Sequence, residues 1–170
     1  LFLEHEMEDS QLRMMFACCH PSLPPEAQIT LILRTLCGLS ITEIANAFLS
    51  NDENITKRLY RAKDKIRSTP IELEVPYGDE LPARLDAVLK AVYLLFNEGY
   101  NSQHPDQLIK QDLCEEALRL GTLLSQHRYT DLPKTAALLS LMYFQASRFD
   151  ARQDDEGNII LLANQDRQKW

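Results

Sequence analysis

Six basic side chains lie close together in one short stretch of an otherwise acidic chain. Residues 52–68 hold six lysines or arginines and three acidic side chains, a balance of +3. Residues 1–51 have a balance of −4 and residues 69–170 one of −6, so the net charge is −7. Lysine and arginine neutralise phosphates, and the local excess therefore predicts contact with nucleic acid. The overall acidity argues against a protein that coats nucleic acid with its whole surface.

The basic residues fall on a predicted helix, mostly away from its apolar side. In residues 53–68 the apolar side chains recur at steps of four, three and four, which is the spacing of one helix face. Asn51 or Asp52 can cap this helix, and it ends before Pro70. Its predicted inner face comprises Ile55, Leu59, Ala62 and Ile66. The side chains predicted to point outward are Thr56, Lys57, Tyr60, Arg61, Lys63 and Asp64, with Arg58 at the margin.

A shorter helix precedes the basic one across a turn. In residues 39–48, Ser40 can cap this helix and Glu43 completes a capping box three residues later. Its predicted inner face comprises Ile41, Ile44, Ala45 and Phe48. Two helices joined in this way form a helix-turn-helix, whose second helix lies in the major groove of DNA. A basic helix alone is more often a solvated surface, but the preceding helix and turn favour DNA binding.

Four short motifs stand in register in this region: Leu39-Ser40, Glu43-Ile44-Ala45, Ile55 and Arg58-Leu59-Tyr60-Arg61-Ala62-Lys63. Together they resemble the fourth conserved domain of bacterial sigma factors of the sigma-70 family, especially the extracytoplasmic-function group. The resemblance covers about residues 8–68. The chain departs from the family pattern at Leu49, where glycine is common, and at Thr56, where a basic residue is common.

Three further motifs resemble one subgroup of these sigma factors. They are residues 12–21 (LRMMFACCHP), Phe96-Asn97-Glu98-Gly99-Tyr100 and Gln165-Asp166-Arg167-x-x-Trp170. This subgroup carries a helical C-terminal extension, sometimes described as tetratricopeptide-like. The resemblance thus extends to the whole chain. It also implies the C-terminal portion of a longer sigma factor, because the family's second domain is absent from these residues.

The resemblance implies promoter recognition without catalytic activity or a cofactor. In the family, the recognition helix binds the −35 promoter element and the domain docks on the flap of RNA polymerase. Promoter DNA and core polymerase are therefore the expected partners. The residues implied for DNA binding are Thr56, Lys57, Arg58, Tyr60, Arg61, Lys63, Lys65 and Arg67. Within this set, Lys63, Lys65 and Arg67 are expected near phosphates or polymerase, whereas Thr56, Lys57, Arg58 and Arg61 are expected to face the DNA.

The periodicity predicts an all-α fold of two domains. Residues 1–70 would form a four-helix domain with the helix-turn-helix, residues 71–81 a linker, and residues 82–170 a helical extension. Other predicted elements are helices at 7–19, 25–36, 82–98, 107–126 and 132–152, a loop at 99–105, a turn at 154–158 and a C-terminal helical turn. Aromatic side chains predicted to belong to the core are Tyr93, Phe96, Tyr143, Phe144 and Phe149.

Other groups of reactive side chains do not meet the requirements of a site. Cys18-Cys19-His20 with Cys37 is a poor zinc site, because adjacent helical cysteines cannot easily bind one metal. Glu98 and His104 lack a nucleophile or a third orienting group, so we expect Glu98 to cap a helix or form a salt bridge. Residues 154–158 lack the length and final glutamate of a calcium loop.

Composition and cysteine spacing indicate a cytoplasmic protein with reduced thiols. No apolar run approaches the roughly 20 residues of a membrane span. Two other functions remain open. A stand-alone helix-turn-helix regulator would use residues 71–170 for dimerisation or ligand binding, and a helical scaffold would bind other proteins. If the chain belongs to a sigma factor, the acidic extension would modulate activity by contacting polymerase or the second sigma domain.

Overall fold

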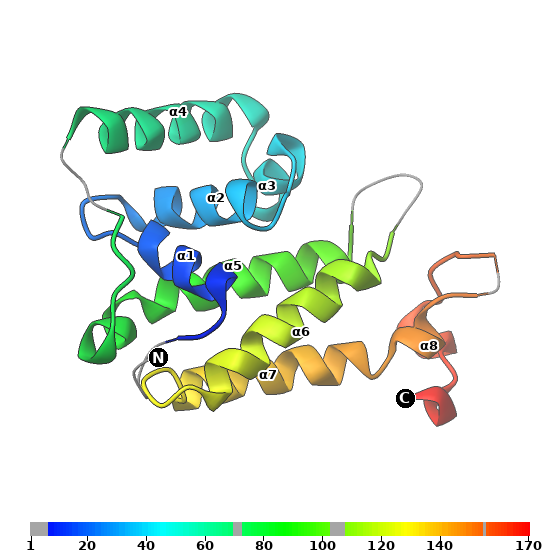
Figure 1. Cartoon of the computed structure of the whole chain (residues 1–170). Coiled ribbons are helices and arrows are strands. Elements are labelled where there is room, and N and C mark those ends of the chain that lie inside the picture. Colours follow the sequence, from blue (N-terminus) through cyan, green and yellow to red (C-terminus); the bar gives the residue numbers. More distant parts are fainter. Residues whose placement is uncertain (1–6, 70–72, 103–107, 155) are drawn as a thin grey trace.

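The computed structural model describes residues 7–69, 73–102, 108–154 and 156–170, and its regular elements there are helices (Figure 1). The α-helices are α1 (Ser10–Cys18), α2 (Pro25–Thr35), α3 (Ile41–Ala47), α4 (Asp52–Ser68), α5 (Leu81–Tyr100), α6 (Gln111–Gln126), α7 (Pro133–Ala146) and α8 (Phe149–Arg152). Single 3-10 turns occupy Gly78–Glu80, Leu162–Asn164 and Arg167–Lys169. Within the described ranges, β-type pairing is limited to one isolated bridge between Gln153 and Ile159. The all-α prediction is confirmed.

Side-chain caps determine where three of the N-terminal helices begin. The Ser40 hydroxyl accepts a hydrogen bond from the Glu43 amide at 3.2 Å, and the Glu43 carboxylate accepts one from the Ser40 amide at 2.6 Å. This is the predicted capping box of α3. Asn51, rather than Asp52, caps α4, and Asp9 caps α1, each by binding the amide three residues later. Each cap satisfies an amide that has no partner within its own helix.

The predicted helix at 132–152 is wrong as a single element, since α7 ends at Ala146 and α8 begins at Phe149. The Ser147 hydroxyl donates to the carbonyl oxygen of Phe144 at 3.0 Å, and such local bonds compete with the helical ladder. Other differences lie at helix ends, where predictions from sequence are least accurate. Parts of the predicted linker, loop and turn, at 70–72, 103–107 and 155, lie outside the described residues.

Helix α5 lies between the two groups of helices and packs against both. It contacts α1, α2 and α3 on one side and α6 and α7 on the other. Figure 1 shows the resulting order, with α4 outermost, α2 and α3 beneath it, then α5, and α6 and α7 beyond. Twelve of the 20 residues of α5 are buried. One continuous apolar core therefore includes side chains of the helix-turn-helix and of the extension, and the predicted division at residues 71–81 stays a prediction.

Three of the aromatic side chains predicted to be in the core are exposed instead. Tyr93 on α5 is 41% exposed, and Tyr143 and Phe144 on α7 are 51% and 75% exposed. Phe96 is buried and Phe149 is half-buried against the core, as predicted. Helix α7 is apolar around much of its circumference, and its main packing partners within the described residues are α5 and α6. Periodicity could not show which of its apolar sides would meet a partner.

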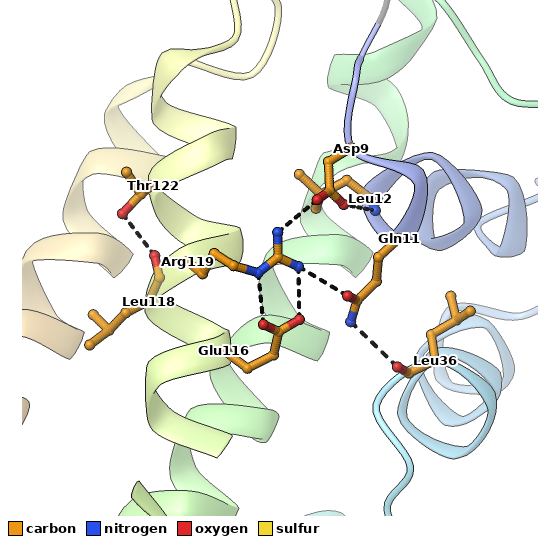
Figure 2. Close-up of polar contacts among 8 residues, drawn as sticks. All are labelled: Asp9, Gln11, Leu12, Leu36, Glu116, Leu118, Arg119 and Thr122. Atoms are coloured by element: carbon orange, nitrogen blue, oxygen red, sulfur yellow. Dashed lines mark hydrogen bonds and ion pairs between the residues drawn. The ribbon is translucent and has the colours of Figure 1, made fainter. Parts of the chain in front are cut away.

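Arg119 joins α6 to the start of α1 through charged hydrogen bonds (Figure 2). Its guanidinium group lies 2.7 Å from the carboxylate of Asp9 and 3.0 Å from the side-chain oxygen of Gln11. Two further bonds, at 2.7 and 2.8 Å, hold the same group on Glu116 of its own helix. Partial burial raises the pKa of Asp9, but the bonds from the Leu12 amide and Arg119 outweigh it and hold that pKa below its ordinary value.

Gly99 allows α5 and the start of α6 to approach closely. A methyl group on Gly99 would lie 2.7 Å from Cys114 Sγ, 2.8 Å from the Lys110 carbonyl oxygen and 2.9 Å from the Cys114 amide nitrogen. Two of these three atoms belong to the backbone, so no side-chain rotation can relieve the clash. The Gly99 carbonyl oxygen also accepts a hydrogen bond from the Lys110 amide at 2.7 Å. The loop predicted at 99–105 therefore begins too early, because Gly99 and Tyr100 are the last two residues of α5.

We expect Gly99→Ala to lower the free energy of unfolding by about 1–3 kcal/mol, because the added methyl group overpacks a rigid contact. Gly121→Ala in α6 is a matched control. Its methyl group would meet only the ends of Met142 and Leu139, which can shift. Urea denaturation of both variants measures the difference. Equal effects at the two positions would show that the α5–α6 contact is not tight at Gly99.

Candidate nucleic-acid interface

Helices α3 and α4 are joined by a turn that contains a residue with a left-handed backbone. Leu49 has a φ of 51° and its side chain is 96% exposed. The turn is closed by the amide of Ser50, which donates to the carbonyl oxygen of Ala45 at 2.8 Å. Such a conformation favours glycine, which agrees with the glycine common at this position in the resembled family. Leu49 therefore adopts the backbone conformation that glycine favours.

The inner side of α4 packs on α2 and α3, as the sequence predicts. Ile55, Leu59 and Ala62 are buried and Ile66 is half-buried. Ile44 and Ala45 of α3 are buried against the same core. These contacts fix α4 on the outside of the molecule, with one long side in solvent. The exposed residues of the candidate set are Thr56, Lys57, Tyr60, Arg61, Lys63, Lys65 and Arg67.

Arg58 differs from the rest of the candidate set, because its side chain lies back on α2. Its guanidinium group is 2.7 Å from the Glu26 carboxylate, 3.3 Å from Thr30 Oγ1 and 4.8 Å from the ring centre of Phe48. Only 23% of the side chain is exposed. Arg58 therefore connects α4 to α2 and to the end of α3. Its partner Glu26 has no sequence signal, since only the tertiary fold brings the two residues together.

Two lysines of α4 also have partners, in addition to Arg58. Lys57 forms an ion pair with Glu53 one turn earlier, at 2.5 Å, and Lys65 donates to the carbonyl oxygen of Ser22 at 2.5 Å. In the described part of the chain, Arg61, Lys63 and Arg67 form no ion pair. These three cations are thus available for a phosphate or a base.

A hollow of about 610 Å³ lies between the start of α2 and one side of α4. Four basic residues line it, namely Lys57, Arg58, Arg61 and Lys65. Three of them follow one another at four-residue steps, so they form a single basic row along α4. The N-terminal end of α2, where the helix dipole favours negative charge, lies beside this row. The row of Lys57, Arg61 and Lys65 can accept the phosphates of a nucleic-acid backbone, whereas Arg58 is paired with Glu26 in the same hollow.

The side chains considered in the sequence as possible metal or catalytic sites form no part of this interface. Among the described residues, no three His, Cys, Asp or Glu side chains are placed together to hold a metal ion. Burial raises the pKa of Cys19 and Cys37 to about 12. Glu98 forms a salt bridge with Lys110, as predicted, and His104 lies outside the described residues. No helix in the described ranges is long and apolar enough to cross a membrane.

The chain matches two family models. Residues 13–66 match sigma-70 region 4, and residues 84–170 match a family of unknown function, DUF6596. An uncharacterized protein of Rhizobium meliloti (strain 1021) is 40% identical over 162 residues, which are 95% of this chain and 38% of that protein. The chain therefore spans less than half the length of this relative. No solved structure matches the chain.

The match over residues 13–66 shows that the helix-turn-helix is a sigma-70 region 4 domain. This confirms the predicted fold of the N-terminal part. The extracytoplasmic-function subgroup and the tetratricopeptide-like character of the extension stay predictions.

We expect Leu49→Gly to raise the free energy of unfolding by about 0.5–1 kcal/mol. Glycine removes the cost of a left-handed backbone, which exceeds the entropy that a new glycine adds to the unfolded chain. Leu49→Ala is the control, since it keeps the Cβ atom and loses little from an exposed side chain. Denaturation in urea compares the two. A Gly variant no more stable than the Ala variant would contradict the left-handed turn.

Arg58→Ala should lower the free energy of unfolding by about 1–2 kcal/mol, through loss of its packing on Phe48 and its bond to Thr30. The ion pair itself adds little, because Glu26 is 63% exposed. Arg61→Ala, three residues later, should change stability by less than about 0.5 kcal/mol. Thermal unfolding of both variants tests this difference. Equal losses would show that Arg58 is no more structural than Arg61.

Proposed function

The chain belongs to the family of unknown function DUF6596 and contains a sigma-70 region 4 domain, and we propose on this basis that it recognises the −35 element of promoters within a sigma factor. The observation that carries the proposal is the outer side of α4. It presents Arg61, Lys63 and Arg67 to solvent, on a helix fixed by α2 and α3. The chain would act by binding DNA and RNA polymerase, without catalysis.

In the proposed complex, α4 lies in the major groove with its exposed side toward the bases. Thr56, Lys57, Tyr60 and Arg61 are the residues proposed to reach base edges or adjacent phosphates. Arginine is suited to guanine, since its guanidinium group can donate two hydrogen bonds to one base edge. Phosphate contacts position the protein but carry no sequence information. Lys63, Lys65 and Arg67 are proposed for phosphates or for polymerase.

Arg58 has a different proposed role from the one that the family resemblance implies. Its guanidinium group is engaged by Glu26 and Thr30 and lies over Phe48. We therefore propose that Arg58 supports α4 from behind instead of contacting the DNA. Its substitution would weaken DNA binding only as far as it loosens α4.

The proposed partner of the whole protein is core RNA polymerase, through the region 4 domain. The relative in Rhizobium meliloti is more than twice as long as the matched region, so this chain corresponds to only part of that protein. A stand-alone regulator would bind DNA without polymerase, usually as a dimer on two half-sites. Co-purification of the chain with core polymerase therefore separates the two functions.

Arg61→Ala should weaken binding to promoter DNA by roughly tenfold and reduce the slope of affinity against salt by about one. Lys134→Ala is the control, because this lysine is on α7 and pairs with Asp86 on α5. Fluorescence anisotropy with a labelled duplex at several salt concentrations, with and without core polymerase, measures both. A tenfold loss in both variants, or in neither, would contradict the proposed interface.

A further inference from the structure

Lys110 directly precedes α6 as its N-cap residue, and its side chain reaches the helix-turn-helix. Its ammonium nitrogen lies 2.5 Å from Glu43 Oε1 in α3 and 3.0 Å from Glu98 Oε1 in α5. The side chains of Lys110, Glu43 and Glu98 are only 13%, 25% and 6% exposed. One cation therefore joins two carboxylates from different parts of the fold, in a region largely screened from water.

The two bonds keep Lys110 and Glu43 charged. Burial alone would raise the pKa of Glu43 and lower the pKa of Lys110. The hydrogen bonds that Lys110 donates to Glu43 and Glu98, with those between Ser40 and Glu43, outweigh the effect of burial. The pKa of Glu43 consequently lies below its ordinary value, and the pKa of Lys110 lies above its ordinary value.

Lys110 is fixed in position by α5. Its backbone amide donates to the carbonyl oxygen of Gly99 at 2.7 Å, which sets its main chain against the end of α5. Glu98, which is also on α5, accepts a further hydrogen bond from the hydroxyl of Ser102 at 2.9 Å. These contacts with α5 hold the ammonium group of Lys110 in position, independently of its contact with α3.

Glu43 connects the Lys110 ammonium group to the proposed recognition helix, α4. One of its carboxylate oxygens binds the Lys110 ammonium group. The other accepts a hydrogen bond from the amide of Ser40, the residue that caps α3. Its neighbour Thr42 donates from Oγ1 to Asp52 Oδ2 at 2.8 Å, and Asp52 is the first residue of α4. In a helix-turn-helix, the N-terminal residues of the second helix contact base edges. Lys110 is therefore linked to the N-terminal end of α4 through Glu43, its chain neighbour Thr42 and Asp52.

We propose that Lys110 is a positioning residue for DNA recognition, which holds α3 on the extension and so sets where α4 begins. The DNA part of this inference rests on the proposed function. Without the ammonium group, two carboxylates would face each other in a poorly solvated site, and their repulsion would push α3 away from α5. The extension would then control DNA recognition through the position of α3, without touching the DNA.

Amide hydrogen exchange of the full chain tests the positioning directly, with no DNA present. Lys110→Met removes the charge and keeps most of the side-chain length. We expect amides of α3 and of the first turn of α4 to exchange at least tenfold faster, while those of α7 keep their rates. Lys134→Met removes another ion pair of the extension and should leave α3 unchanged. Unchanged exchange of α3 in Lys110→Met would overturn the proposal.

A second variant covers the case in which Lys110→Met unfolds as a whole, with faster exchange in α7 as well. Glu43→Gln removes one of the two facing carboxylates and can be combined with Lys110→Met. If the proposal is right, the double variant exchanges no faster in α3 than Lys110→Met alone and recovers the protection of α7. Independent, multiplying effects of the two substitutions would overturn the coupling between these residues.

DNA binding gives a separate measurement. Lys110→Met should bind a promoter duplex at least several-fold more weakly than the unchanged chain, whereas Lys134→Met should bind equally well. If exchange of α3 rises as expected but even the unchanged chain does not bind the duplex with core polymerase present, the proposed function fails and the positioning of α3 stands. Faster exchange with unaltered affinity would overturn the role of Lys110 in recognition.

Discussion

Burial of α5 on two sides is the constraint on which the rest of the structure depends. The helix covers the inner surfaces of α1, α2 and α3, and its opposite side receives α6 and α7. Residues such as Leu85, Val88 and Leu95 are fully buried, so removal of α5 would expose apolar surface of both groups of helices. Helix α4 depends on the same burial indirectly, because it packs on α2 and α3.

The charged residues have two separate uses in this fold. Two cations at the start of α6 and within it, Lys110 and Arg119, bind carboxylates at the starts of α3 and α1, Glu43 and Asp9. Cations on the outer side of α4 lie in solvent instead. A count of charges along the chain locates the basic helix but cannot distinguish these uses, because the partners lie 67 and 110 residues apart in the sequence.

Local features of the fold could be predicted from the sequence, and long-range ones could not. The capping box at Ser40 and Glu43 and the buried side of α4 depend on residues three or four apart, so spacing is sufficient to predict them. The position of Arg58 depends on Glu26, to which no spacing rule applies. The prediction that the aromatic side chains of α7 belong to the core was wrong for a related reason. Phe144 has the spacing of a core residue, but burial requires a neighbouring element that the pattern of one helix does not specify.

Glu43 belongs to the Glu-Ile-Ala motif of the helix-turn-helix, yet its carboxylate also binds a residue at the start of α6. One oxygen caps α3 and the other binds Lys110. A change at position 43 therefore acts on two structures at once. The cap alone could be formed by glutamine as well as by glutamate. In chains that keep the extension, positions 43 and 110 should evolve as a pair, with an acidic residue at the first whenever a basic one occupies the second.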